Sequence, residues 1–92
     1  MRTGFDAAAG ERVTLDLEVL IGELKRALEG AHGLPGRDVS SIDELIRAGE
    51  WEVALETLCT QISEYELQVS NEQQLHLRHL GQFLKVQVDD LL

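Results

Sequence analysis

The spacing of large apolar residues between positions 49 and 66 constrains the fold of this chain more than any other sequence feature. These residues recur at intervals of four, three, four and three: Trp51, Leu55, Leu58, Ile62 and Tyr65. The intervals follow the period of one face of an α-helix. We therefore predict a helix over residues 50–66 that buries this stripe in a core and exposes its opposite side.

Three further segments repeat the helical period, and we predict helices near residues 14–29, 41–48 and 71–91. Their apolar positions are Leu17, Leu20, Ile21, Leu24 and Leu28 in the first, Ile42, Leu45 and Ile46 in the second, and Leu77, Leu80, Leu84, Val88 and Leu91 in the last. Phe83 lies at the edge of the last stripe, and Gly81 within it indicates close packing. No segment shows sustained alternation of apolar and polar residues, so strands are not expected.

Local start and stop signals set the predicted boundaries. Ser41 followed by Glu44, and Ser70 followed by Gln73, match the capping box that opens a helix. Gly49 supplies the left-handed residue that ends one. The sequence thus predicts an all-α protein, a compact four-helix bundle that forms a single domain over residues 1–92, with residues 1–12 as a loosely ordered lead-in.

The length and composition exclude several classes of protein. A chain of 92 residues builds one core but no enclosed substrate cavity beside it. The single cysteine rules out an internal disulfide and a cysteine-rich zinc site, which suits a reducing compartment. The sequence has neither an apolar run of membrane-spanning length nor the apolar core of a signal peptide. We therefore expect a cytoplasmic protein that does not bind a membrane.

The negative charge is concentrated in one part of the chain. The formal net charge is −9, and residues 38–72 contain nine acidic residues but only one base, Arg47, which leaves −8 in that segment. Residues 73–92 sum to zero. Such a field repels the phosphates of nucleic acid and attracts a basic protein. A negative surface that serves only solubility is the alternative interpretation of the same pattern.

The exposed side of the 50–66 helix is the candidate binding site. Val53 lies opposite the apolar stripe, and acids and threonines surround it without an intervening base. A small apolar centre with a charged rim is typical of a protein interface. The predicted partner-binding residues are Glu50, Glu52, Val53, Glu56, Thr57, Thr60, Glu64 and Glu66.

The titratable residues indicate neither catalysis nor a metal site. Cys59 flanks the core stripe, where a buried thiol is unreactive. Glu72, His76 and His79 share one side of the last helix, but three ligands on one exposed helix are a weak metal signal. Glu52 and Glu56 have neither a nucleophile nor a histidine beside them. We predict no catalytic residues, no cofactor and no bound metal.

A small acidic helical chain also invites comparison with acyl carrier proteins, which attach phosphopantetheine to the serine of an Asp-Ser-Leu-like motif. The nearest stretch here is GRDVSSIDEL, in which Val39 separates Asp38 from Ser40. The helix predicted to follow ends before Gly49 and is too short for the recognition helix of that family. The carrier hypothesis therefore ranks last.

The segment from Ile42 to Phe83 resembles the small helical immunity proteins of bacterial polymorphic toxin systems, the MafI-like family. The resemblance rests on LIRAGEWEVALETLCTQISEYE followed by a polar break and LRHLGQFL. The matching positions are Ala54, Leu55, Glu56, Leu58 and Cys59, then Glu64, Tyr65 and Glu66, and finally Leu80 and Gly81. The match covers less than half of the chain, and most of these positions are expected in the core.

The resemblance implies an immunity protein that binds a cognate toxin in the producing cell and blocks its activity. Toxins of this kind are often nucleases with basic substrate grooves, so an acidic helix face would imitate a phosphate backbone. The alternative, from another functional class, is an acidic helical adaptor or regulatory protein that binds a basic housekeeping partner. Charge alone does not distinguish the two.

Overall fold

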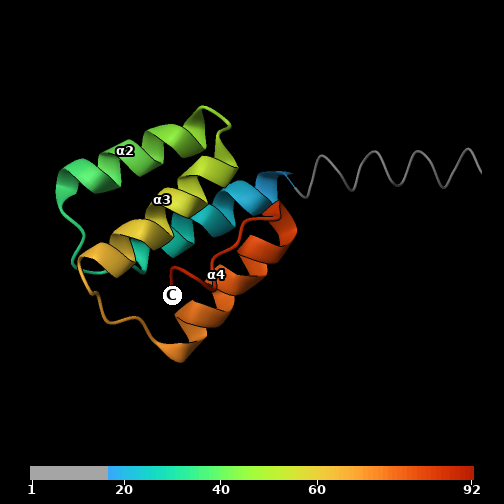
Figure 1. The fold of residues 1–92 in the computed structure, drawn as a ribbon. Coiled ribbons are helices and arrows are strands. Elements are labelled where there is room, and N and C mark those ends of the chain that lie inside the picture. The colour runs from blue at the N-terminus through green and yellow to red at the C-terminus, as the bar shows by residue number, and fades with distance from the viewer. Residues whose placement is uncertain (1–16) are drawn as a thin grey trace, which may run out of the picture.

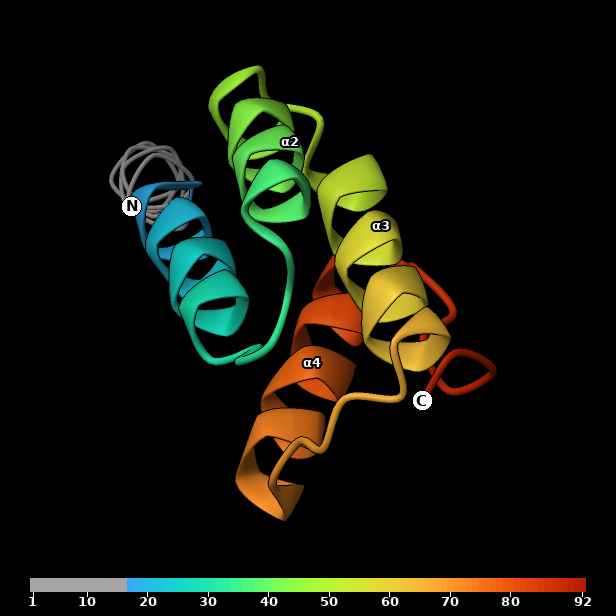
Figure 2. The ribbon, with the colours of Figure 1, turned by 90° about the vertical axis from the view of Figure 1, so that its left-hand side faces the viewer.

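The computed structural model describes residues 17–92, and this part of the chain is a bundle of helices without strands (Figure 1). Helical residues 17–29 are followed by α2 (Gly36–Arg47), α3 (Trp51–Glu64) and α4 (Asn71–Leu84). Figure 2 shows the first helix, α2, α3 and α4 arranged around a common interior. The predicted all-α four-helix bundle is confirmed.

The apolar stripes of all four segments meet in one core. The buried apolar side chains are Leu20, Leu24, Ala27, Leu28, Ala31, Ile42, Ile46, Ala54, Leu55, Leu58, Cys59, Ile62, Leu77, Leu80, Leu84 and Val88. Leu45, Trp51 and Leu91 pack against this core while remaining partly exposed. The aliphatic composition of the core follows from the scarcity of aromatic residues in the chain.

Two residues that we expected in the core lie outside it. Leu17 is 39% exposed and Tyr65 is 40% exposed. Tyr65 is the residue that directly follows α3, and its hydroxyl donates a 2.8 Å hydrogen bond to the Asp38 carboxylate on α2. Its ring therefore spans the surface between two helices, where the polar end of a tyrosine is satisfied.

Helix α2 begins five residues earlier than predicted, at Gly36 rather than Ser41. Pro35 precedes it in an extended conformation, and its carbonyl accepts the amides of Asp38 and Val39 at 3.0 and 3.1 Å. Ser41 lies inside the helix, so the capping box assigned to it was wrong. The predicted start at Ser41 left Gly36 outside the helix, but a proline without an amide proton is compatible with a helix start.

Three helices end in the same way, with a left-handed residue followed by an amide that donates five residues back. The left-handed residues are Gly49 (φ 80°), Glu66 (φ 52°) and Lys85 (φ 60°). The corresponding bonds, 2.8–2.9 Å long, are Glu50 N to Leu45 O, Leu67 N to Ile62 O, and Val86 N to Gly81 O. The prediction at Gly49 is confirmed, whereas Glu and Lys at the other two positions carry no such sequence signal.

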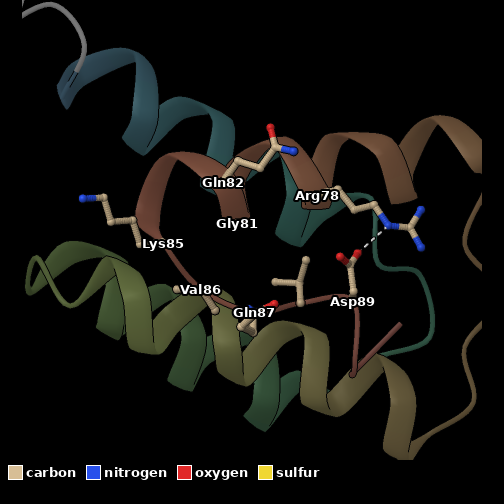
Figure 3. A pocket seen from close by; sticks show the side chains of 8 residues that line it. Arg78, Gly81, Gln82, Lys85, Val86, Gln87 and Asp89 are labelled. Atoms are coloured by element: carbon tan, nitrogen blue, oxygen red, sulfur yellow. Dashed lines mark hydrogen bonds and ion pairs between the residues drawn. The ribbon is translucent and has the colours of Figure 1, made fainter.

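Helix α4 ends at Leu84, seven residues before the predicted end at Leu91. Lys85 reverses the chain, and the following segment returns along α4, where Arg78 Nε donates to Asp89 Oδ1 at 2.9 Å (Figure 3). Gly81 permits this return. A Cβ there would lie 2.9 Å from the Val86 carbonyl oxygen and 3.0 Å from a Val88 methyl. The close packing indicated by Gly81 is therefore with the C-terminal segment.

Candidate protein-binding face of helix α3

The outward side of α3 is built by the same period that builds its buried side. Ala54, Leu55, Leu58, Cys59 and Ile62 are buried, which turns the opposite side of the helix, with Glu52, Val53 and Glu56, outward. Of the eight predicted partner-binding residues, six are exposed and two are half-buried. The exposed ones are Glu50, Glu52, Val53, Glu56, Glu64 and Glu66, and the half-buried ones are Thr57 and Thr60.

Hydrogen bonds to α2 hold α3 in place at both ends. The Trp51 indole Nε1 donates to the Ile46 carbonyl at 3.1 Å, near the C-terminal end of α2. At the other end, Gln61 Nε2 donates to Asp38 Oδ1 at 3.2 Å, beside the bond from Tyr65. The α2–α3 pair is thus fixed at two separated points, so the side chains on the outer side of α3 stand on a well-supported helix.

The carboxylates of α3 lack internal counterions in the part of the chain that the structure describes. The ion pairs there use Glu23 with Arg26 and His76, Asp43 with Arg47, and Asp89 with Arg78. None of them uses a predicted partner-binding residue. Within residues 17–92, no side-chain ion pair therefore neutralises the charge on this side of α3.

The structure brings part of the predicted site together with residues that the sequence did not reveal. A hollow of about 400 Å³ lies between α3 and the C-terminal turn. On the α3 side it is lined by Glu56, Thr57, Thr60 and Gln61, and on the side of the C-terminal turn its lining includes Gln87 and Asp90. Asp90 was missed because the last helix was expected to continue through it. Asp90 lies near α3 because the chain reverses at Lys85, and no sequence motif predicts that reversal.

Glu66 is separated from the rest of the predicted site. It lies beyond the end of α3 in a left-handed conformation and borders a different hollow, shared with Ser63, Leu67 and Gln74 among others. Sequence spacing extended the helical face through this position. The helix ends at Glu64, so Glu66 is not on that face.

Cys59 is fully buried, and burial raises the pKa of its thiol to about 12. The cause is desolvation, which disfavours the thiolate. A thiol in this environment remains protonated at neutral pH and lacks the character of a nucleophile.

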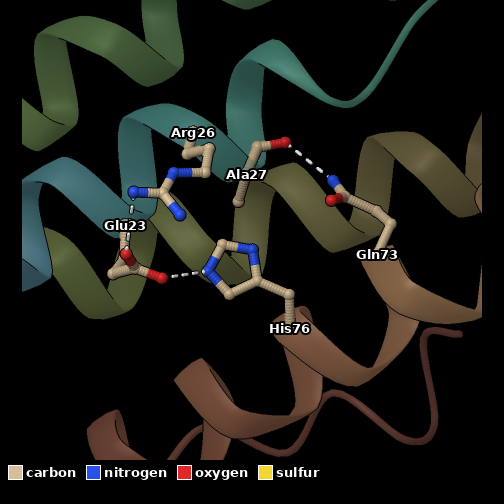
Figure 4. A network of polar contacts seen from close by, with 5 residues as sticks. All are labelled: Glu23, Arg26, Ala27, Gln73 and His76. Atoms are coloured by element: carbon tan, nitrogen blue, oxygen red, sulfur yellow. Dashed lines mark hydrogen bonds and ion pairs between the residues drawn. The ribbon is translucent and has the colours of Figure 1, made fainter.

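The three residues considered as metal ligands do not form a cluster. His76 Nε2 lies 2.6 Å from Glu23 Oε1 on the first helix, and Glu23 also pairs with Arg26 (Figure 4). Nearby, Gln73 Nε2 donates to the Ala27 carbonyl at 2.9 Å. Within residues 17–92, no three His, Cys, Asp or Glu side chains gather closely enough to hold a metal ion.

Because of the Gln73 contact, only one half of the second predicted capping box forms. Ser70 caps α4 as predicted, because its Oγ accepts the Gln73 amide at 3.0 Å. The Gln73 side chain, however, reaches across to the first helix. A Cβ on Gly30 would come within 2.9 Å of Gln73 Oε1, so Gly30 leaves space for this bridge.

The segment compared with a carrier motif, GRDVSSIDEL, forms the first ten residues of α2. Both oxygens of Asp38 accept hydrogen bonds from the side chains of Gln61 and Tyr65, while Ser40 is exposed on the helix. The helix is 12 residues long, longer than the sequence indicated. Asp38 therefore joins α2 to the C-terminal end of α3.

The comparisons with other proteins place this chain in no family. No protein-family model, no curated protein and no solved structure matches it. Among the helices of the described region, none has the length and apolar character required to cross a bilayer. The chemistry of the surface is therefore the main basis for assigning a function.

Proposed function

We propose that this chain is an immunity protein, one that binds a bacterial toxin through the outer side of α3 and neutralises it. The observation that carries the proposal is the set of exposed carboxylates on one helix, without counterions among residues 17–92 and with Val53 exposed between them. The resemblance of residues 42–83 to MafI-like immunity proteins supports the same function.

The layout of this face suits a basic protein partner. Val53 is 45% exposed and supplies a small apolar centre, while Glu52, Glu56 and Glu64 supply charge around it. In an interface, the apolar centre loses water and the charged rim selects the partner. Lys and Arg side chains of a toxin would pair with these three carboxylates.

The mechanism of neutralisation is occlusion. An acidic helix seated on a basic groove covers the groove and presents negative charge where a phosphate backbone would bind, with no bond to cleave. A nuclease is the toxin class that fits this mechanism. The concentrated field also accelerates encounter with a basic surface, which an inhibitor of a lethal enzyme requires.

The test reverses charge at the proposed site and, separately, elsewhere. The expected partner is a toxin with a variable C-terminal domain, encoded beside this chain's reading frame. The triple variant Glu52→Lys, Glu56→Lys and Glu64→Lys should bind it roughly 100-fold more weakly, because three attractions become repulsions. It should melt near the wild-type temperature, since these side chains lie off the core.

The matched control is Glu18→Lys, Glu29→Lys and Glu44→Lys, which makes the same change in net charge at exposed positions on other helices. It should retain most of the affinity and protect cells that express the toxin. Equal weakening by both variants would mean that only the overall charge matters. Unchanged affinity of a folded α3 variant would move the binding site away from this face.

The adaptor hypothesis predicts a different pattern. The chain would fail to bind or protect against the toxin, while a basic cellular protein would bind the wild type and lose affinity for the α3 variant. Protection of toxin-expressing cells is therefore the measurement that separates the two functions.

A further inference from the structure

The outer side of α4 bears a second exposed surface, of a different chemical kind from that of α3. Leu75 is 54% exposed and Phe83 is 59% exposed, and the exposed His79 lies midway between them. Intervals of four residues keep the three on one side of the helix, with Leu75 and Phe83 about 12 Å apart along the axis. We call Leu75, His79 and Phe83 the α4 stripe.

A hollow of about 360 Å³ lies between the α4 stripe and the first helix. Val19 and Leu20 line it from the first helix, and His79, Leu80 and Phe83 line it from α4. Val19 is 59% exposed, like Phe83 across the hollow. Large apolar side chains exposed together beside a hollow are typical of an interaction site.

The chain enters the described region at the edge of this hollow. The structure describes the chain from Leu17, and residues 1–16, with the predicted lead-in, lie outside the described residues. Val19 is within one helical turn of Leu17, and Figure 1 shows the start of the first helix beside the end of α4. Residues 1–16 are therefore joined to the described region next to Val19 and Phe83.

The composition of residues 1–16 suits an apolar hollow. Phe5 is their one aromatic residue, and the alanines at positions 7–9 that follow it are small. Residues 1–12 sum to zero charge in a chain of net charge −9. The acidic bundle therefore does not repel this segment as it would repel a second negatively charged chain.

The segment is also long enough to bring Phe5 to the hollow. If the first helix begins near Thr14, as the sequence predicts, its start lies about 8 Å beyond Val19. The nine residues from Phe5 to Thr14 span up to about 30 Å when extended. Gly10 lies between them, and a glycine permits the chain to reverse.

The covalent connection favours this segment over a separate partner. A surface as small as the hollow binds a free protein weakly. A segment of the same chain is present at an effective concentration that is roughly millimolar, so a contact too weak to form between molecules can form within one.

We propose that residues 1–16 fold back over the first helix and α4, with the Phe5 ring in the hollow against Val19 and Phe83. The contact uses no residue of α3, so it is independent of the proposed toxin binding.

The first test is a disulfide placed beside the contact, which leaves the Phe5 and Phe83 rings in place. Asp6→Cys combined with His79→Cys joins the residue after Phe5 to the middle of the α4 stripe. Equilibration of the full chain in glutathione buffers gives the effective concentration of the two thiols. Cys59 is fully buried, and burial keeps it out of the exchange.

The matched control is Asp6→Cys combined with Lys25→Cys, because Lys25 is exposed on another side of the first helix. The pair at positions 6 and 79 should have an effective concentration at least about tenfold above the control pair. Phe5→Ser in the same background should lower it to the control value. Equal values for the two pairs would overturn the proposal and leave the hollow to a separate partner. Disulfide-linked dimers in place of the internal bond would also overturn it, and would assign the hollow to a second copy.

A double-mutant cycle tests the contact between the two rings without cysteines. Phe5→Ala and Phe83→Ala should each raise the equilibrium constant of unfolding about two- to tenfold in urea denaturation, and the double variant should raise it no further. The effects of Phe5→Ala and Val53→Ala, the control pair, should simply add. Additive effects of Phe5→Ala and Phe83→Ala would contradict the proposed contact.

Discussion

Helices α3 and α4 are each 14 residues long and bury one side in the same core, yet their outer sides differ in kind. The outer side of α3 carries acids around one valine, whereas that of α4 carries Leu75 and Phe83 with little net charge. The comparison separates two properties of an amphipathic helix. The apolar residues that recur with the 3.6-residue period determine how the helix packs in the core. The residues on its exposed side determine which partner it can bind.

The inner sides of the two helices should be equivalent, and this is the largest effect that we predict. Leu58 and Leu77 are both almost fully buried, so Leu58→Ala and Leu77→Ala should each lower the free energy of unfolding by about 2–5 kcal/mol through loss of contacts and a residual cavity. Val53→Ala should change it by less than about 0.5 kcal/mol. Urea denaturation measures all three. An unchanged midpoint for Leu58→Ala would contradict the assigned core.

The next prediction concerns the C-terminal segment, which packs on the buried side of α4. Gly81→Ala should destabilise by about 1–3 kcal/mol, because the new methyl group meets the Val86 carbonyl and Val88. A Cβ on Gly22, in the first helix, would have no neighbouring side chain within 4 Å, so Gly22→Ala should stabilise by about 0.5–1 kcal/mol. Thermal melts of the two variants should shift in opposite directions. Shifts of the same sign would contradict the path of the C-terminal segment.

A smaller effect is expected from the thiol on the inner side of α3. The pKa of Cys59 is raised from 9.0 to about 12 in the folded protein, so above pH 9 the unfolded chain loses this proton before the folded one. Stability from this group is complete below pH 9 and declines as the pH rises toward 12. Between about pH 8 and 10.5, the wild type should lose stability faster than Cys59→Ala. Parallel losses in urea titrations would show that the thiol is not buried.

The sequence predicted the fold class and most of the core, because the helical period is a property of local spacing. It failed where the chain changes direction without a glycine. Glu66 and Lys85 adopt left-handed conformations that their residue types do not predict. The predicted C-terminal ends of α3 and α4 were therefore placed too late in the sequence. Val88 is buried as predicted, although it lies in the returning segment and not in a helix.

The candidate site, like the fold, was predictable where it depends on local spacing and not where it depends on contacts between distant segments. The exposure of Glu52, Val53 and Glu56 follows from the phase of α3 and was anticipated. The position of Asp90 beside α3 depends on tertiary packing and was not anticipated from the sequence. The α4 stripe was not predicted either, although the four-residue spacing of Leu75, His79 and Phe83 is visible in the sequence.

The most direct test of the proposed role of α3 is the salt dependence of association with the toxin domain, measured by stopped flow between about 20 and 500 mM NaCl, over which the screening length falls several-fold. The wild-type association rate constant should fall steeply across this range. The Glu52→Lys, Glu56→Lys and Glu64→Lys variant should associate slowly with a flattened dependence, while the Glu18, Glu29 and Glu44 reversal should keep a clear decline. A wild-type rate constant that does not change with salt would contradict the acidic face as the basis of recognition.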